Sequence, residues 1–76
     1  MLSDFEILAL RKLYESRSFL ASKPGEVVRL ANPGGVTHGM LAEIAHRTEF
    51  HARLPQDYQL GNPLPTVIIM EYAPVL

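Results

Sequence analysis

The stretch TVIIMEY, residues 66–72, decides the fold, because it carries the strongest strand signal in the chain. Its residues are mostly β-branched or aromatic, and Pro63 and Pro65 interrupt regular structure just before it. Strand alternation gives two faces, one with Ile68, Met70 and Tyr72 and the other with Val67, Ile69 and Glu71. Both faces are largely apolar. In a domain of 76 residues, helices can cover one face but not two, so we expect the second face to meet another chain.

A second strand is predicted at residues 26–31, EVVRLA, a short β-branched run that follows Pro24 and Gly25. Residues 19–22 could pair with it as a hairpin across Pro24 and Gly25, or they could continue the preceding helix. A plain Pro-Gly turn matches the twist of paired strands poorly, which makes the hairpin the weaker alternative.

Two helices are predicted. Ser3 and Glu6 form the S-x-x-E capping box that starts a helix at Asp4, and the apolar residues of this helix spread around most of its circumference. A helix of this kind needs cover on more than one side. The second helix is expected from His38 to about Arg53, with Thr37 as its N-cap, and residues 56–65 after it are expected to be irregular.

The glycine-rich loop ANPGGVTHGM, residues 31–40, precedes the second helix, as phosphate-binding loops do. Met40 and Leu41, however, stand where a P-loop carries lysine and a hydroxyl residue. Asn32, Pro33 and Gly34 instead have the order of residues that a tight turn favours. The loop is therefore predicted to reverse the chain and to start a helix, with no cofactor bound.

The elements together predict one α+β domain over residues 1–76, with a long N-terminal helix, a short strand, a second helix and a C-terminal strand. If the two strands pair, the second helix would connect them in a right-handed parallel crossover. A two-stranded sheet is marginally stable alone, so the fold is expected to be completed by dimerisation.

Composition narrows the functional classes. The net charge is −1 and no short window gathers basic residues, which makes nucleic acid an unlikely partner. There is no cysteine, no apolar run long enough to span a membrane, and no basic start of the kind that opens a secretory signal. We therefore expect a soluble cytoplasmic protein.

No complete set of catalytic or metal-binding residues is present. Glu43 and His46 form one E-x-x-H, but di-iron sites need two, and His38 and His51 lie on other faces of the predicted helix. A dimer that brings symmetric histidines together is the remaining route to a metal site. We expect no enzyme activity, no cofactor and no metal.

The surplus of apolar surface favours a non-enzymatic protein-interaction module, a small homodimeric regulator or inhibitor of a protein partner. Aromatic and arginine side chains carry much of the energy of such interfaces. The candidate contacts are Leu10, Tyr14 and Arg17 on the first helix and Val67, Ile69 and Tyr72 on the last strand. The alternatives are a DNA-binding regulator of the helix-turn-helix type and a structural subunit of a larger assembly.

Overall fold

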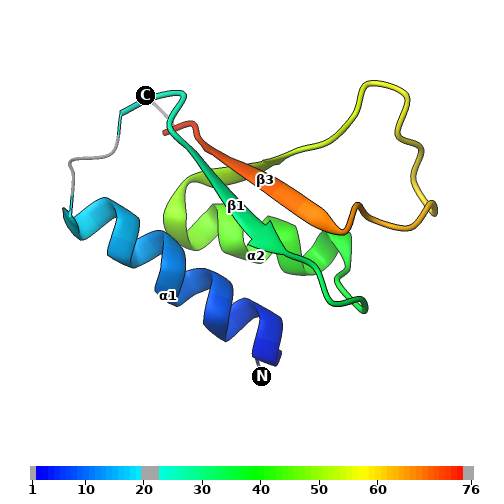
Figure 1. The fold of residues 1–76 in the computed structure, drawn as a ribbon, viewed down its shortest axis with the longest axis horizontal. Coiled ribbons are helices and arrows are strands. Elements are labelled where there is room, and N and C mark those ends of the chain that lie inside the picture. Colours follow the sequence, from blue (N-terminus) through cyan, green and yellow to red (C-terminus); the bar gives the residue numbers. More distant parts are fainter. Residues whose placement is uncertain (1, 20–22, 75–76) are drawn as a thin grey trace.

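The computed structural model describes residues 2–19 and 23–74 of the chain (Figure 1). Its elements are, in chain order, α1 (Asp4–Phe19), β1 (Val27–Ala31), α2 (His38–Thr48), β2 (Phe50–Arg53) and β3 (Val67–Tyr72). The predicted α+β fold is confirmed, and so are both helices and both strands. The choice between helix and hairpin for residues 19–22 is settled only for Phe19, which ends α1, because residues 20–22 lie outside the described part.

The sheet has three strands in the order β1-β3-β2, and β3 is antiparallel to both neighbours. The predicted parallel pairing of the first and last strands is therefore wrong. The helix α2 connects β1 to β2, which run in the same direction at the two edges of the sheet. The chain then returns through residues 54–66 and inserts β3 between them in the opposite direction, so that no crossover joins β1 to β3 directly.

The second helix ends at Thr48. The predicted end near Arg53 is therefore wrong. Glu49 takes a left-handed conformation with φ of 64°, and its backbone N–H donates to the Ala45 carbonyl at 2.8 Å. A left-handed residue of this kind terminates helices, although glycine is its usual occupant. The residues after it leave the helix and form the edge strand β2, which was not predicted from the sequence.

The predicted starts of both helices are confirmed. In the capping box, the Ser3 N–H donates to Glu6 Oε1 at 3.0 Å and the Glu6 N–H donates to Ser3 Oγ at 3.1 Å. The Met40 N–H donates to Thr37 Oγ1 at 3.2 Å, which makes Thr37 the N-cap of α2. Asn32 closes the turn before it, since its Oδ1 accepts the Gly34 N–H at 2.9 Å.

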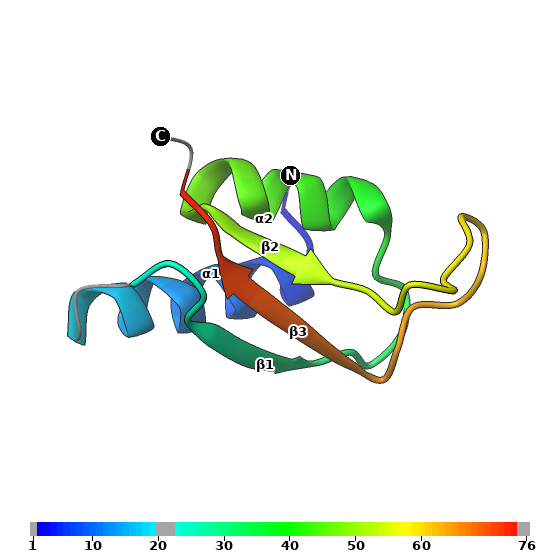
Figure 2. The same cartoon turned by 90° about the horizontal axis from the view of Figure 1, so that it is seen from above.

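Both helices pack on one face of the sheet and leave the other face open (Figures 1 and 2). On the covered face, side chains of all three strands meet residues of α1 and α2 in one core. Its largest fully buried apolar side chains are Leu13, Ile44, Phe50, Ile68 and Met70. The side of β3 that carries Ile68, Met70 and Tyr72 therefore supplies the core, a choice that the sequence left open because both sides of this strand are largely apolar.

The connection 54–66 extends away from the helices and sheet (Figure 1). It contains no helix or strand, as predicted. Several hydrogen bonds join it to the rest of the described chain. Asn32 donates from its backbone N–H to the Thr66 carbonyl and from Nδ2 to the Pro65 carbonyl, both at 2.8 Å, and His38 Nε2 lies 2.9 Å from the Tyr58 hydroxyl. Since this hydroxyl donates to the Asn62 carbonyl, it accepts the hydrogen bond from His38.

Candidate functional site

The structure separates the six residues predicted to form an interface. Leu10 and Tyr72 are only 8% and 9% exposed and belong to the core. Tyr72 packs against Phe50, with 5.2 Å between ring centroids, and beneath the guanidinium of Arg17. In the single chain, neither Leu10 nor Tyr72 presents its side chain to a partner.

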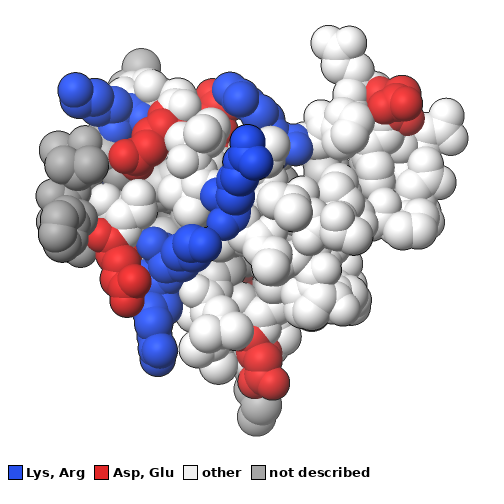
Figure 3. All heavy atoms as spheres, viewed as in Figure 1, with Lys and Arg blue, Asp and Glu red and all other residues white. Residues whose placement is uncertain are grey.

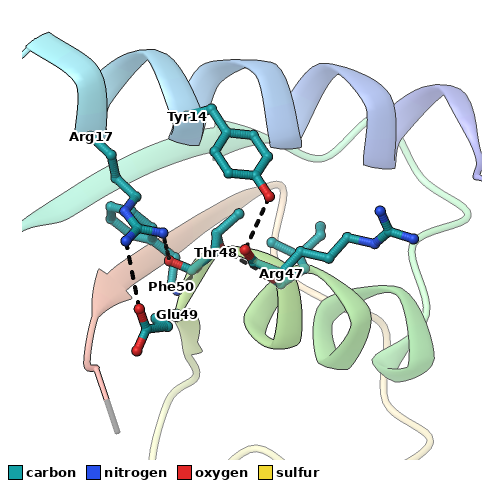
Figure 4. A network of polar contacts seen from close by, with 7 residues as sticks. Tyr14, Arg17, Arg47, Thr48, Glu49 and Phe50 are labelled. Atoms are coloured by element: carbon teal, nitrogen blue, oxygen red, sulfur yellow. Dashed lines mark hydrogen bonds and ion pairs between the residues drawn. The ribbon is translucent and has the colours of Figure 1, made fainter. Parts of the chain in front are cut away.

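Tyr14 and Arg17 contact the C-terminal end of α2 (Figure 4). The Tyr14 hydroxyl donates to the Arg47 carbonyl at 3.0 Å, and Arg17 Nη1 donates to the Thr48 carbonyl at 3.0 Å. These carbonyls belong to the last turn of a helix, where backbone acceptors lack helical donors and a positive charge is favourable. Both residues therefore join α1 to α2. Tyr14 nevertheless remains 47% exposed.

Val67 and Ile69 do lie on the open face of the sheet. We use this name for the side chains that point away from the helices: Val27, Arg29, Ala31, His51, Arg53, Val67, Ile69 and Glu71. Val27 and Val67 are each 47% exposed, and Arg53 forms an ion pair with Glu71. The face thus combines aliphatic side chains with two arginines.

A second surface was not predicted. An apolar groove of about 310 Å³ runs between α1 and the edge strand β1. Its apolar walls are formed by Phe5, Leu8, Ala9, Leu30, Ala31 and Pro33, and Asp4 and Lys12 complete its lining. Leu8 is 64% exposed, an unusually large exposure for a leucine beside an apolar groove. We call this surface the α1 groove.

The α1 groove exists because α1 packs against α2 and the covered face but leaves a gap beside β1. Lys12 crosses this gap, and its Nζ donates to the Arg29 carbonyl at 3.1 Å. The contact occupies one backbone acceptor of an edge strand, whose outward carbonyls are otherwise available for pairing. The sequence signal for the groove was the apolar surface around most of the first helix, but periodicity could not say which apolar side would stay uncovered.

The three histidines lie in two different places on the surface. His46 and His51 line a shallow hollow of about 650 Å³ beside Ala45 and Glu49, while His38 contacts Tyr58. Among the described residues, no group of three or more histidine, aspartate or glutamate side chains could hold a metal ion.

Glu43 of the E-x-x-H pairs with Arg47 within α2. Arg47 Nε donates to Glu43 Oε1 at 2.8 Å, four residues apart on the exposed side of the helix. This hydrogen bond lowers the pKa of Glu43 below its ordinary value and raises the pKa of Arg47. The pair stabilises the charged forms of both groups, which is typical of i,i+4 pairs on a helix surface.

The helix-turn-helix alternative has little geometric support, because β1 lies between α1 and α2 where that motif has a short turn.

In the part of the chain that the structure describes, no helix is both long and apolar enough to cross a membrane. Searches of protein-family models, curated proteins and solved structures found no match to the chain.

Proposed function

We propose that this protein is a small, non-enzymatic interaction module that forms a homodimer through the α1 groove and regulates or inhibits a protein partner. The observation that carries the proposal is the pattern Asp4, Leu8, Lys12 along the exposed side of α1 beside the groove. A second copy of the chain is the occupant that this pattern fits.

The three residues are spaced four apart, so they lie in one stripe along the helix. Leu8 is in the middle, an acid is at one end and a base is at the other. If two α1 helices pack antiparallel about a two-fold axis through Leu8, Asp4 of each copy meets Lys12 of the other. A two-fold interface is self-complementary in this sense: each contact occurs twice.

The same packing would bury the apolar surface that the single chain leaves exposed. Leu8 of one copy would enter the groove of the other, beside Phe5, Leu30 and Pro33. Full burial of a leucine side chain contributes about 2 kcal/mol, and a symmetric interface contains it twice. Lys12 can keep its bond to the Arg29 carbonyl, since an ammonium has three N–H donors.

The open face of the sheet is a poorer surface for self-association. A face-to-face pair of sheets would bring Arg29 and Arg53 of one copy toward the same arginines of the other. Like charges that face each other across an interface disfavour association. A small molecule is also a poor occupant of the α1 groove, because small-molecule sites place several polar groups inside an apolar pocket and this groove has charges only on Asp4 and Lys12.

Sedimentation equilibrium at micromolar concentration tests the dimer. We expect a dimer for the native chain and a monomer for Leu8→Ser. Ile7→Ser is the matched control, because Ile7 is also an exposed apolar residue of α1, 45% accessible, and does not line the groove. A strictly monomeric native chain would refute the proposal, and an open-ended series of larger species would favour the structural-subunit alternative.

Reversing the charge of Asp4 or Lys12 tests whether the two α1 helices pack antiparallel. The variants Asp4→Lys and Lys12→Glu each place like charges opposite each other in the antiparallel pair, so each alone should be monomeric. Mixed in equal amounts they complement each other and should form a heterodimer. Circular dichroism of each variant verifies that it folds. If the mixture stays monomeric while the native chain dimerises, the antiparallel arrangement is wrong.

A further inference from the structure

We infer that the open face of the sheet binds an acidic segment of a partner protein, with Arg29 and Arg53 as the residues that contact its carboxylates. Arg29 and Arg53 do not line the α1 groove, although Ala31 and Lys12 lie at the border between the two surfaces, so the inference does not depend on the proposed dimer. It names the chemistry of the partner that a regulatory module of this kind would recognise.

The two arginines form a row across the sheet. Arg29 on β1 and Arg53 on β2 are both opposite Ile69 on the central strand β3, and all three side chains point away from the helices. Neighbouring strands lie about 4.8 Å apart, so the Cα atoms of the two arginines are separated by about 10 Å. Two guanidinium groups therefore flank one aliphatic side chain on an exposed surface.

Lys12 extends this row beyond the edge of the sheet. Its Nζ lies against the carbonyl of Arg29, which places a third positive charge next to the first arginine. Figure 3, in the view that has α1 and β1 toward the reader, shows a diagonal band of lysine and arginine side chains with acidic side chains mostly at its margins. The chain as a whole has a net charge of −1, so the band is a local concentration of positive charge in a nearly neutral protein.

The carboxylate nearest the row is Glu71, which pairs with Arg53. Both partners are partly exposed, with 58% of the Arg53 side chain and 30% of the Glu71 side chain accessible. Exposed pairs of this kind contribute little energy and exchange readily. A carboxylate of a partner can therefore compete with Glu71 for Arg53, and Arg29 offers a guanidinium beside it.

The aliphatic residues of the face distinguish a protein partner from a nucleic acid. Val27, Val67 and Ile69 lie around the arginines, and no phenylalanine, tyrosine or tryptophan belongs to the open face. Single-stranded nucleic acids are bound by stacking their bases on aromatic side chains, and duplexes by many phosphate contacts. A peptide that carries both acidic and aliphatic side chains matches the arginines and the valines together.

The test is a titration of the full chain with a short acetylated peptide made of repeated Leu-Glu-Glu units. Calorimetry and NMR of the backbone amides, both at low salt, monitor the binding. We expect binding with shift changes centred on Val67, Ile69 and Arg53. Arg29→Gln and Arg53→Gln should each weaken binding about threefold, and the double variant about tenfold, as expected for exposed charge contacts. Arg47→Gln removes an equal charge from α2, away from this face, and should leave the affinity unchanged.

Glu71→Gln is expected to strengthen peptide binding, in contrast to the arginine variants. It removes the carboxylate that competes for Arg53, so the peptide should bind about twofold more tightly. Repeating the titration with Leu8→Ser separates this inference from the dimer, because binding should persist in a monomer. The inference is overturned if the double arginine variant binds the peptide as well as the native chain does. It is equally overturned if duplex DNA or a single-stranded oligonucleotide binds more tightly than the peptide and loses affinity in the same variant.

Discussion

Arg17 on α1 donates a 3.0 Å hydrogen bond from Nη1 to the carbonyl of Thr48, the last residue of α2. The same guanidinium lies 3.6 Å from Glu49 Oε1 and 5.2 Å from the centroid of the Tyr72 ring. One side chain thus connects the first helix, the end of the second helix and the last strand. These contacts are within the chain, which gives Arg17 a structural role independent of any partner.

Replacement of Arg17 is therefore expected to destabilise the fold. In Arg17→Gln, the Thr48 carbonyl loses a charged donor at a helix C-terminus, and the cost should be about 1 kcal/mol because the group is partly exposed. Urea unfolding monitored by circular dichroism measures it. Arg11→Gln is the control, since Arg11 is exposed on the same helix and its loss should change stability by less than about 0.5 kcal/mol. Equal midpoints for the two variants would contradict the role assigned to Arg17.

Thr48 is a buried polar residue with both of its hydrogen-bonding functions in use. Its hydroxyl donates to the Ile44 carbonyl at 2.7 Å and accepts the Phe50 N–H at 3.1 Å. Thr48→Val keeps the shape but leaves a buried N–H without its acceptor, at a cost of about 1–3 kcal/mol. The same substitution at the exposed Thr66 should be nearly neutral. Chemical denaturation measures the free energy of unfolding of the two variants. Similar losses of stability at both positions would contradict the role of the Thr48 hydroxyl as a buried hydrogen-bond acceptor.

Glu49 has a φ of 64°, a conformation that strains any residue with a Cβ atom. Glu49→Gly and Glu49→Ala both remove the carboxylate near Arg17, and they differ in backbone freedom. The glycine variant should be the more stable by about 1 kcal/mol, since it adopts a left-handed conformation without steric cost. Thermal unfolding of the pair isolates the backbone contribution. If alanine is as stable as glycine, the turn after α2 is not left-handed in solution.

The hydrogen bond from Arg47 lowers the pKa of Glu43, and this shift has a defined pH dependence. Because the folded-state pKa lies below the unfolded value, the contribution of the pair to stability is complete above the unfolded pKa. It is lost as the pH falls through the lower, folded-state pKa. NMR titration of the Glu43 side-chain carboxyl should give a lowered pKa in the native chain and a return toward the ordinary value in Arg47→Gln. An unchanged value in that variant would assign the shift to another cause.

Local signals in the sequence predicted the elements well. The Ser3–Glu6 capping box, the Thr37 N-cap and the alternation of residues 66–72 each act over a few residues, and each is present in the structure as expected. The end of α2 was missed for an equally local reason: the residue that terminates it is Glu49, not glycine, and its left-handed conformation has no distinctive residue type. Arg53 was consequently assigned to a helix when it belongs to β2.

The candidate surfaces were harder to predict. Tyr14 and Arg17 are residue types that dominate interfaces, but they are equally suited to binding the carbonyls at a helix end. Leu10 is apolar, a type that suits an interface and a core equally, and its position on the helix turns it into the core. Residue type cannot distinguish a side chain that binds a partner from one that makes contacts within the chain, because this depends on which neighbours the fold brings near.

The sequence by itself determined where both helices begin, where the first and last strands run and which residues alternate between the two sides of β3, since caps, turns and side-chain periodicity are properties of adjacent residues. Only the tertiary structure decided that β3 lies between β1 and β2, and it thereby placed Arg29 and Arg53 on either side of Ile69. It likewise decided that α1 leaves a groove beside β1. Both surfaces depend on contacts between segments far apart in the chain, and their energies are set by packing and pairing that no single stretch of sequence contains.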